Sequence, residues 1–199
     1  MTVRIAVLAS GRGTNLQALI DHFSHLGAHS PATIELVASN KENAPALDRA
    51  RNASIAAESF TANDEGSELL ELLARYRIEL VVLAGYMKRI PPSVVSEFHG
   101  RIVNVHPGLL PEFGGAGMYG ARVHQAVLAS GALMTGVTVH LVDDEFDHGP
   151  VVAQWRVKVR DNDTAETLAA RVLEVEHAIY PKAVEMIASL NQRKLSADF

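Results

Sequence analysis

The sequence of 199 residues contains no cysteine. Disulfide bonds, thiolate zinc sites, iron–sulfur clusters and a cysteine nucleophile are therefore excluded. Positive charge is also scarce, because 18 Lys and Arg against 23 Asp and Glu give a net charge of −5. We expect no nucleic-acid partner, since proteins that read the phosphate backbone carry a surplus of basic residues. No apolar run approaches the ~20 residues of a membrane helix, so we expect no membrane partner either.

The remaining composition is that of a folded globular protein, with 48% hydrophobic and 21% charged residues. At roughly 150 residues per domain, the length predicts a single domain over residues 1–199. Residues 1–9 form a short apolar run that contains Arg4, which is typical of a first strand and not of a signal peptide. We therefore expect a cytoplasmic protein.

Apolar runs alternate with amphipathic segments along the first half of the chain. Runs rich in β-branched residues predict strands, and apolar residues at helical spacing predict helices between them. This alternation is typical of a doubly wound α/β fold with a mostly parallel sheet. The predicted strands cover residues 3–9, 33–39, 55–60, 79–84 and 101–106, and the predicted helices cover residues 16–25, 44–51, 65–76 and 92–98.

The pattern changes in the second half. Two long apolar strands, residues 133–142 and 150–160, are joined by the acidic stretch 143–149 and predict an antiparallel or mixed extension of the sheet. Residues 164–190 predict a long C-terminal helix, which Pro181 is expected to kink.

The loop of residues 10–15, SGRGTN, lies between the first predicted strand and helix, where ligands bind in open α/β sheets. Its two glycines allow close approach of the backbone, and the helix start offers free N–H groups to an anion. Leu16 stands where a dinucleotide motif has its third glycine, and no acid follows the second strand at residues 39–40, so a monophosphate is favoured. The alternative is a tight turn that caps the helix through Thr14 or Asn15. The candidate phosphate-binding residues are Gly11, Arg12, Gly13, Thr14 and Asn15.

A second group of candidates lies where the strand 101–106 ends. Alternation along a strand places Asn104 and His106 on the same face. An aspartate from the acidic stretch 143–149 would orient His106 and favour its charged form. A carboxamide that donates to an oxyanion and an imidazole that moves protons suit acyl transfer. Because the chain has no G-x-S-x-G elbow and no cysteine, we expect the nucleophile to be the substrate itself.

Plainer interpretations stay open for these residues. Asn104 and His106 would equally cap a sheet edge, and most of the acidic stretch would be solvated. His140 is either a further polar candidate or a core histidine. A metal site of His106, His140 and Asp147 is conceivable, but H-E-x-x-H is absent and we predict no metal.

Five motifs occur in order along nearly the whole chain: SGRGTNL from residue 10, LAGYM from residue 83, NVHPGLLP from residue 104, DHGP from residue 147 and EHAIYP from residue 176. Together they resemble the phosphoribosylglycinamide formyltransferases, folate-dependent enzymes of purine synthesis. Several 10-formyltetrahydrofolate enzymes share the pattern N-x-H-P-x-L-L-P of the third motif, whereas the first and last motifs point to this family among them.

The resemblance implies that the amine of glycinamide ribonucleotide attacks the formyl carbon of the co-substrate 10-formyltetrahydrofolate, giving N-formylglycinamide ribonucleotide and tetrahydrofolate. It implies that Asn104 stabilises the oxyanion and that His106 carries protons with Asp147 as its partner. The loop 10–15 would hold the phosphate, and Glu176 would bind the ribose hydroxyls. The N-terminal half would thus bind the ribonucleotide, and the C-terminal half would bind the folate and carry the catalytic loop.

The same resemblance implies a folate pocket, no metal and no nucleotide cofactor, and it leaves a homodimer open. The residues implied at the folate are Leu83, Met87, Lys88, Arg89, Ile90, Asn104, Val142, Asp143, Asp144, Glu145, Phe146 and Asp147.

The sequence departs from the family pattern at three places. Gly108 stands where a serine is usual, and residues 112–123 form a glycine-rich loop that differs from the commonest form. Residues 61–68 lack an arginine that many members use near the folate, for which Lys88 or Arg89 would substitute.

The nearest rival function is a formyltetrahydrofolate hydrolase, in which water replaces the amine. That family usually carries an additional N-terminal regulatory domain and lacks this phosphate loop. A methionyl-tRNA formyltransferase would need a further tRNA-binding domain with a basic surface. A nucleotide-binding oxidoreductase would need the missing glycine and ribose-binding acid, and a non-catalytic binding module would not need Asn104, His106 and Asp147 together.

Overall fold

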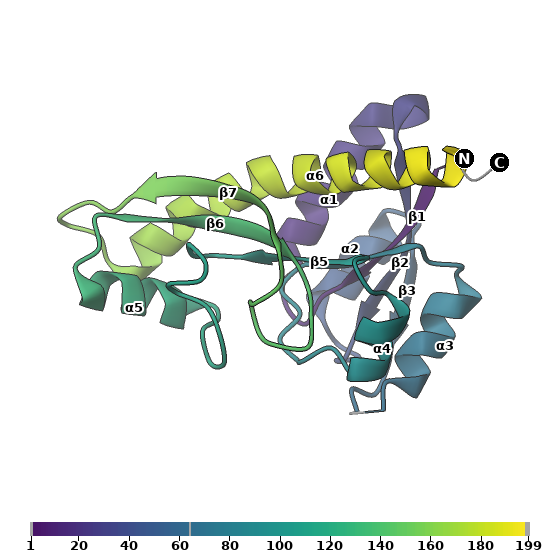
Figure 1. The fold of residues 1–199 in the computed structure, drawn as a ribbon, viewed down its shortest axis with the longest axis horizontal. Helices are drawn as coiled ribbons and strands as arrows, with labels where there is room; N and C mark the ends of the chain where they lie inside the picture. The colour runs from purple at the N-terminus through teal and green to yellow at the C-terminus, as the bar shows by residue number, and fades with distance from the viewer. Residues whose placement is uncertain (1, 64, 198–199) are drawn as a thin grey trace.

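The computed structural model describes residues 2–63 and 65–197, with side chains as far as residue 191. In this part of the chain a seven-stranded sheet has the order β3-β2-β1-β4-β5-β6-β7 (Figure 1). The first five of these strands are parallel, and β6 and β7 extend the sheet antiparallel. The predicted α/β class with a mostly parallel sheet is confirmed. The strands are β1 (Val3–Leu8), β2 (Ala32–Ser39), β3 (Ala56–Ser59), β4 (Leu80–Leu83), β5 (Ile102–His106), β6 (Met134–Leu141) and β7 (Val151–Lys158).

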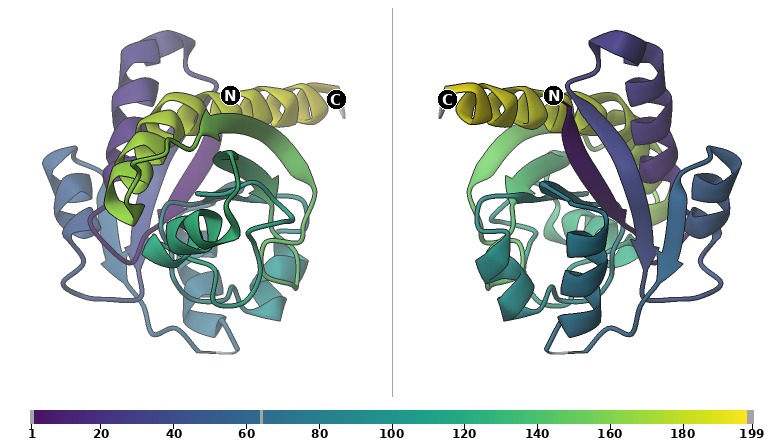
Figure 2. Two further views of the ribbon diagram at one scale, coloured as in Figure 1. Left: turned by 90° about the vertical axis from the view of Figure 1, so that its left-hand side faces the viewer. Right: turned by 90° about the vertical axis from the view of Figure 1, so that its right-hand side faces the viewer.

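Helices cover both faces of the sheet (Figure 2). One face carries α1 (Thr14–Leu26), α2 (Pro45–Asn52), α5 (Ala121–Ser130) and α6 (Ala165–Ala197), and η1 (Gly27–His29) follows α1. The other face carries α3 (Ser67–Arg75) and α4 (Pro92–Glu97). Two packed layers of side chains therefore enclose the sheet, as expected for a doubly wound fold. None of the described helices is both long and apolar enough to cross a membrane.

Two helices differ from the sequence prediction. The long C-terminal helix is present, but it runs from Ala165 to Ala197 and so extends beyond the predicted end at residue 190. Pro181 lies inside it, and a kink there stays a prediction. Helix α5 was not predicted, because it follows a glycine-rich loop that carries no helical pattern. Its buried face consists of Val123, His124 and Val127, which are spaced as one side of a helix.

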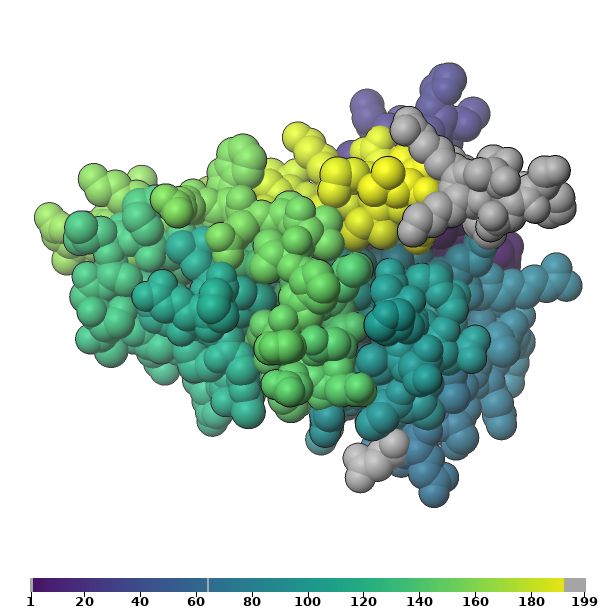
Figure 3. Space-filling view, in the orientation of Figure 1, coloured from purple at the N-terminus to yellow at the C-terminus, as the bar shows by residue number. Residues whose placement is uncertain are grey.

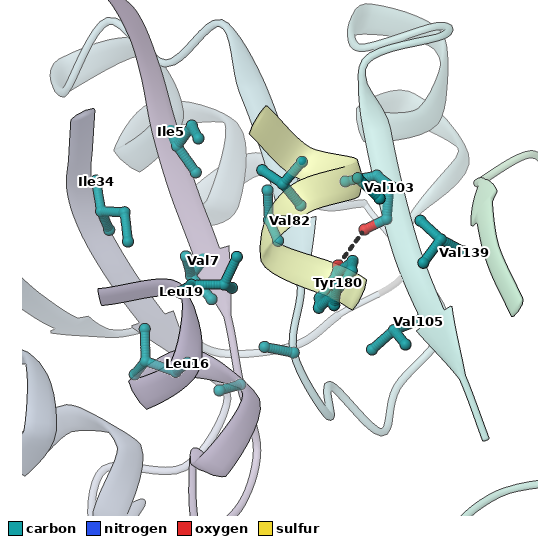
Figure 4. Close-up of a cluster of buried hydrophobic side chains, with 14 of the residues drawn as sticks. Ile5, Val7, Leu16, Leu19, Ile34, Val82, Val103, Val105, Val139 and Tyr180 are labelled. Atoms are coloured by element: carbon teal, nitrogen blue, oxygen red, sulfur yellow. Dashed lines mark hydrogen bonds between the residues drawn. The ribbon is translucent and has the colours of Figure 1, made fainter. Parts of the chain in front are cut away.

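Tyr180 fixes α6 to the middle of the sheet. Its side chain is fully buried, and its hydroxyl donates to the carbonyl oxygens of Leu83 at 2.8 Å and Val103 at 3.1 Å. Figure 4 shows the bond to Val103 within the surrounding apolar cluster. Because residues four apart share a helix face, Glu176 on the preceding turn also faces the sheet.

The order of strands creates a topological switch point between β1 and β4, where ligands bind in folds of this kind. The loops that follow these two strands are joined there. The N–H of Ser10 donates to the carbonyl of Gly85 at 3.1 Å, and the N–H of Met87 donates to Oγ of Ser10 at 3.0 Å. Since β5 lies beside β4, the segment from Asn104 to His106 ends at the same edge of the sheet.

Candidate active site

A cavity of about 580 Å³ lies at this edge of the sheet. It reaches from Arg12 and Asn15 at the start of α1 to the acidic segment between β6 and β7. In the space-filling view, the green segment after β6 lies between the teal residues of the α5 side and those of α4 (Figure 3). The predicted residues that line the cavity are Arg12, Asn15, Leu83, Met87, Lys88, Arg89, Ile90, Asn104, His106, His140, Val142, Asp143, Asp144, Glu145, Phe146, Asp147 and Glu176.

Four polar side chains meet in the centre of the cavity. The antiparallel register of β5 and β6 pairs Asn104 with His140, and Nδ2 of Asn104 lies 3.1 Å from Nε2 of His140. One oxygen of Asp147 lies 3.5 Å from Nε2 of His140, and the other lies 3.4 Å from Nδ1 of His106. The structure thus brings the carboxamide and imidazole of one predicted strand together with a carboxylate from the acidic stretch 143–149.

Asp147 is held in place by the backbone around it. Its φ of 55° is in the left-handed region, which a non-glycine residue adopts rarely and which is common at functional sites. The N–H of Gly115, in the glycine-rich loop, donates to Oδ2 of Asp147 at 3.1 Å. The loop therefore anchors the carboxylate, a role that was not predicted for it.

The pKa shift of His106 beside Asp147 differs from the expectation. Burial alone raises the pKa of Asp147, but its contact with His140, the nearby ring of His106 and the N–H of Gly115 together outweigh burial and lower the pKa. For His106, burial lowers the pKa by more than Asp147 raises it. The expected shift of His106 toward its charged form is therefore reversed, because the ring is almost completely buried.

Both ring nitrogens of His106 have partners. Its Nε2 lies 2.7 Å from the carbonyl oxygen of Phe113, which can only accept a hydrogen bond, so Nε2 carries a proton. Its Nδ1 faces Asp147. Hence the neutral ring has its free lone pair on Nδ1, and any proton gained there is stabilised by the carboxylate.

The loop of residues 10–15 is shaped by its glycines and by α2. Gly13 has a φ of 70°, and a Cβ at this position would lie 2.9 Å from Cβ of Ala46. The N–H of Ala46 donates to the carbonyl of Gly11, and the guanidinium of Arg49 donates to the carbonyl of Arg12. No side chain caps α1 at Gly13, so the alternative of a turn that caps the helix through Thr14 or Asn15 is wrong. The first N–H groups of α1 have no partner within the helix and are suited to an anion.

Asn15 is directed elsewhere. Its Nδ2 donates to the carboxylate of Glu176 on α6, while its buried Oδ1 has no partner among the described residues. Burial raises the pKa of Glu176 to about 7, although the hydrogen bond from Asn15 acts in the opposite direction. This buried amide–carboxylate pair in the cavity wall is suited to hydroxyl groups of a ligand.

Some predicted residues lie outside the cavity, and others were missed. Gly11, Gly13 and Thr14 belong to the loop but do not line the cavity. Four of the missed residues that line the cavity lie within the LAGYM and NVHPGLLP motifs but were not singled out there. The others come from the glycine-rich loop, α5 and one face of α6, where none of the five motifs indicated them. All of the missed residues together are Gly85, Tyr86, Val105, Pro107, Gly115, Gly117, Met118, Tyr119, Gly120, Ala121, His124, Ala165, Glu166, Ala169 and Leu173.

Two further features bear on the departures from the family pattern. A Cβ on Gly108 would lie 3.0 Å from Val123 and 3.1 Å from Nε2 of His106, so a serine would crowd both. The guanidinium of Arg89 donates to the carbonyl of Asp144 and thereby joins the loop after β4 to the acidic segment.

Within residues 2–63 and 65–191, no three acidic or imidazole side chains are arranged to hold a metal ion.

Comparisons with known proteins agree with this fold. The model of the formyl transferase family matches residues 3–184, and the chain belongs to this family. The chloroplastic phosphoribosylglycinamide formyltransferase of Vigna unguiculata is 40% identical over 92% of this chain, which spans 60% of that relative. The phosphoribosylglycinamide formyltransferase of Escherichia coli (strain K12) is 39% identical over 94% of this chain and 87% of the relative.

A solved structure gives the same result. The crystal structure of phosphoribosylglycinamide formyltransferase from Anaplasma phagocytophilum matches with a TM-score of 0.86 and 36% identity, covering 95% of this chain and 88% of that one. The resemblance inferred from the motifs is thereby confirmed.

Proposed function

We propose that this chain transfers the formyl group of 10-formyltetrahydrofolate to the amine of glycinamide ribonucleotide, giving N-formylglycinamide ribonucleotide and tetrahydrofolate. The observation that carries the proposal is the composition of one cavity. It contains both the group of Asn104, His106 and Asp147 and the pair of Asn15 and Glu176. The names of the relatives support the same reaction.

Asn104 acts on the formyl oxygen. When the lone pair of the amine forms the new C–N bond, the π electrons of the formyl C=O move to oxygen, and an N–H of the carboxamide donates to this oxyanion. The contact with Nε2 of His140 holds the carboxamide in place. Collapse of the oxyanion then breaks the bond to N10 of the folate, which takes up a proton.

His106 and Asp147 serve the proton transfers. The amine loses a proton when it becomes an amide, and N10 gains one when it leaves. We infer that these protons pass through Nδ1 of His106, because the carbonyl of Phe113 keeps Nε2 protonated. Asp147 stabilises the imidazolium that forms at that moment.

The two substrates occupy different parts of the cavity in this proposal. The phosphate lies against the start of α1 and Arg12, and Glu176 with Asn15 binds the ribose hydroxyls. The folate lies among apolar walls such as Leu83, Ile90 and Val142, with the acidic segment 143–147 beside its polar ring atoms. The chemistry needs neither a metal nor a nucleotide cofactor, since substrate amine and formyl carbon react directly.

The remaining proposals concern the whole protein. We propose that residues 1–199 act as one formyltransferase domain, with ribonucleotide contacts from the N-terminal half and folate contacts and the catalytic loop from the C-terminal half. Its substrates are small molecules. A cytoplasmic location fits an enzyme of purine synthesis, and fractionation of cells that express the chain would test it. Sedimentation of the purified protein would decide between a monomer and a homodimer.

The reaction itself is tested by following folate deformylation spectrophotometrically, with and without glycinamide ribonucleotide and in the presence of EDTA. We expect turnover that requires the ribonucleotide and is insensitive to the chelator. Turnover that continues without ribonucleotide would instead identify the hydrolase, in which water replaces the amine. Loss of turnover in EDTA would contradict the metal-free mechanism.

A further inference from the structure

Three histidines line the cavity, and one of them has no assigned role. Both nitrogens of His106 face protein groups, namely the Phe113 carbonyl and Asp147. Those of His140 face the Leu141 carbonyl and Asn104. In His124, by contrast, Nδ1 is buried and has no hydrogen-bond partner in the described part of the chain. A buried polar atom without a partner calls for an explanation, and a bound ligand can supply the missing bond.

The position of His124 is set by α5. The preceding residue, Val123, packs against Gly108, where the absence of a Cβ allows the helix to come close to the segment after β5. Only 4% of the surface of His124 is exposed, so its ring is fixed in the cavity wall. Helix α5 also packs against α6, which carries Glu176. His124 thus lines the same cavity as His106 and Glu176.

Burial, together with the proximity of His106, lowers the pKa of His124. Its imidazole is therefore neutral near pH 7 and offers one donor and one acceptor. The amine and the amide N–H of glycinamide ribonucleotide need an acceptor in a buried site, because an unpaired N–H there weakens binding.

We propose that His124 binds the glycinamide arm of the ribonucleotide by accepting a hydrogen bond from one of its N–H groups. It thereby positions the amine for attack on the formyl carbon. This inference rests on the proposed function. It adds a residue from a helix whose sequence carries none of the five motifs.

The test uses three variants of the full-length protein. His124→Phe keeps the ring volume and removes both nitrogens, whereas His124→Asn and His124→Gln place an amide near Nδ1 and Nε2, respectively. His177→Phe is the matched control. His177 on α6 also has a buried ring nitrogen without a partner in the described residues, but it does not line the cavity.

We expect His124→Phe to weaken binding of glycinamide ribonucleotide about tenfold by calorimetry, which corresponds to the loss of one hydrogen bond. The KM for 10-formyltetrahydrofolate should change less than twofold. One of the two amide variants should recover most of the affinity and so identify the nitrogen. His177→Phe should leave ribonucleotide affinity within twofold of the wild type.

The inference is overturned if His124→Phe binds the ribonucleotide within twofold of the wild type, or if neither amide variant recovers affinity. A measurement on the wild type does not depend on how the variants fold. Adding ribonucleotide should shift the ¹⁵N resonances of the His124 ring, and unchanged resonances would also overturn the inference. If the wild type itself fails to bind glycinamide ribonucleotide, the proposed function fails instead.

Discussion

The two ends of the cavity are built in different ways. At the loop of residues 10–15, the backbone sets the geometry through the left-handed Gly13, its contact with α2 and the start of α1. At the catalytic centre, contacts between segments far apart in the sequence set the geometry. Asn104 and His140 are 36 residues apart in sequence, and Gly115 and Asp147 are 32 apart. The geometry of the first end is therefore set mainly by the backbone, whereas the geometry of the second depends on each of the contacting groups. Substitutions at the catalytic centre should change kcat, and substitutions at the other end should change ribonucleotide binding.

The largest expected effect is at the catalytic centre. His106→Ala and Asp147→Asn should each lower kcat by about 10²–10⁴-fold, because both remove proton transfer at Nδ1 of His106. Ribonucleotide affinity should stay within about threefold, since Asn15 and Glu176 are unchanged. Steady-state kinetics and calorimetry would measure the two quantities. If both variants also lost the ribonucleotide, the two ends of the cavity would not be separable.

A substitution at Glu176 should affect ribonucleotide binding more than kcat. Glu176→Gln should raise the KM for the ribonucleotide about tenfold and change kcat less, because a neutral amide accepts hydrogen bonds from hydroxyl groups less strongly than a carboxylate. Substrate kinetics at pH 8 would show this.

We also expect Glu176→Gln to change how the free energy of unfolding depends on pH. Burial raises the pKa of Glu176 to about 7, well above the ordinary value of 4.5 that the unfolded chain has. Between these values the folded state binds more protons than the unfolded state, so the free energy of unfolding falls as the pH rises through this window. Glu176→Gln should therefore be more stable than the wild type by about 1–3 kcal/mol at pH 8 and nearly equal to it at pH 4.5. Denaturant unfolding at both pH values checks this, and a less stable variant at pH 8 would contradict it.

The smallest expected effect is at Gly108, where the absence of a Cβ leaves room for the ring of His106. Gly108→Ser should lower kcat about fivefold, since its Cβ would crowd Nε2 of His106 and displace the ring. Adding Val123→Ala should recover part of the activity, because it removes the other close contact of that Cβ. Kinetics of the single and double variants would decide, and an unchanged kcat in Gly108→Ser would show that the ring moves without cost.

Sequence patterns predicted much of the fold because apolar periodicity is a local property. The continuous apolar runs of β1 and β4 and the helical spacing in α1 and α3 were sufficient. Helix α5 was not predicted because its buried face is short and follows a glycine-rich loop, whose residues are typical of turns. The cavity residues on α5 and on one face of α6 were not predicted either. Ala169 and Leu173, for example, are ordinary helix residues, and they line the cavity only because of where the helix lies.

The direction of the pKa shift of His106 also could not be predicted from the sequence. A nearby acid correctly predicted an upward influence on the pKa of His106, but how deeply the ring is buried decides the sign of the shift, and burial is a property of packing. The alternative of a cap through Asn15 failed for a similar reason, because α6 offers Asn15 a buried carboxylate that is 161 residues away.

By itself, then, the amino-acid order determined the class of fold, the polar pair at the end of β5, the glycine turn after β1 and the family to which the chain belongs. Only the tertiary structure decided that Asp147 contacts both His106 and His140, that Asn15 pairs with Glu176, and that His124 lines the cavity. The physical reason is distance along the chain: propensity and alternation act over a few residues, whereas these contacts arise when distant elements pack together and lose water.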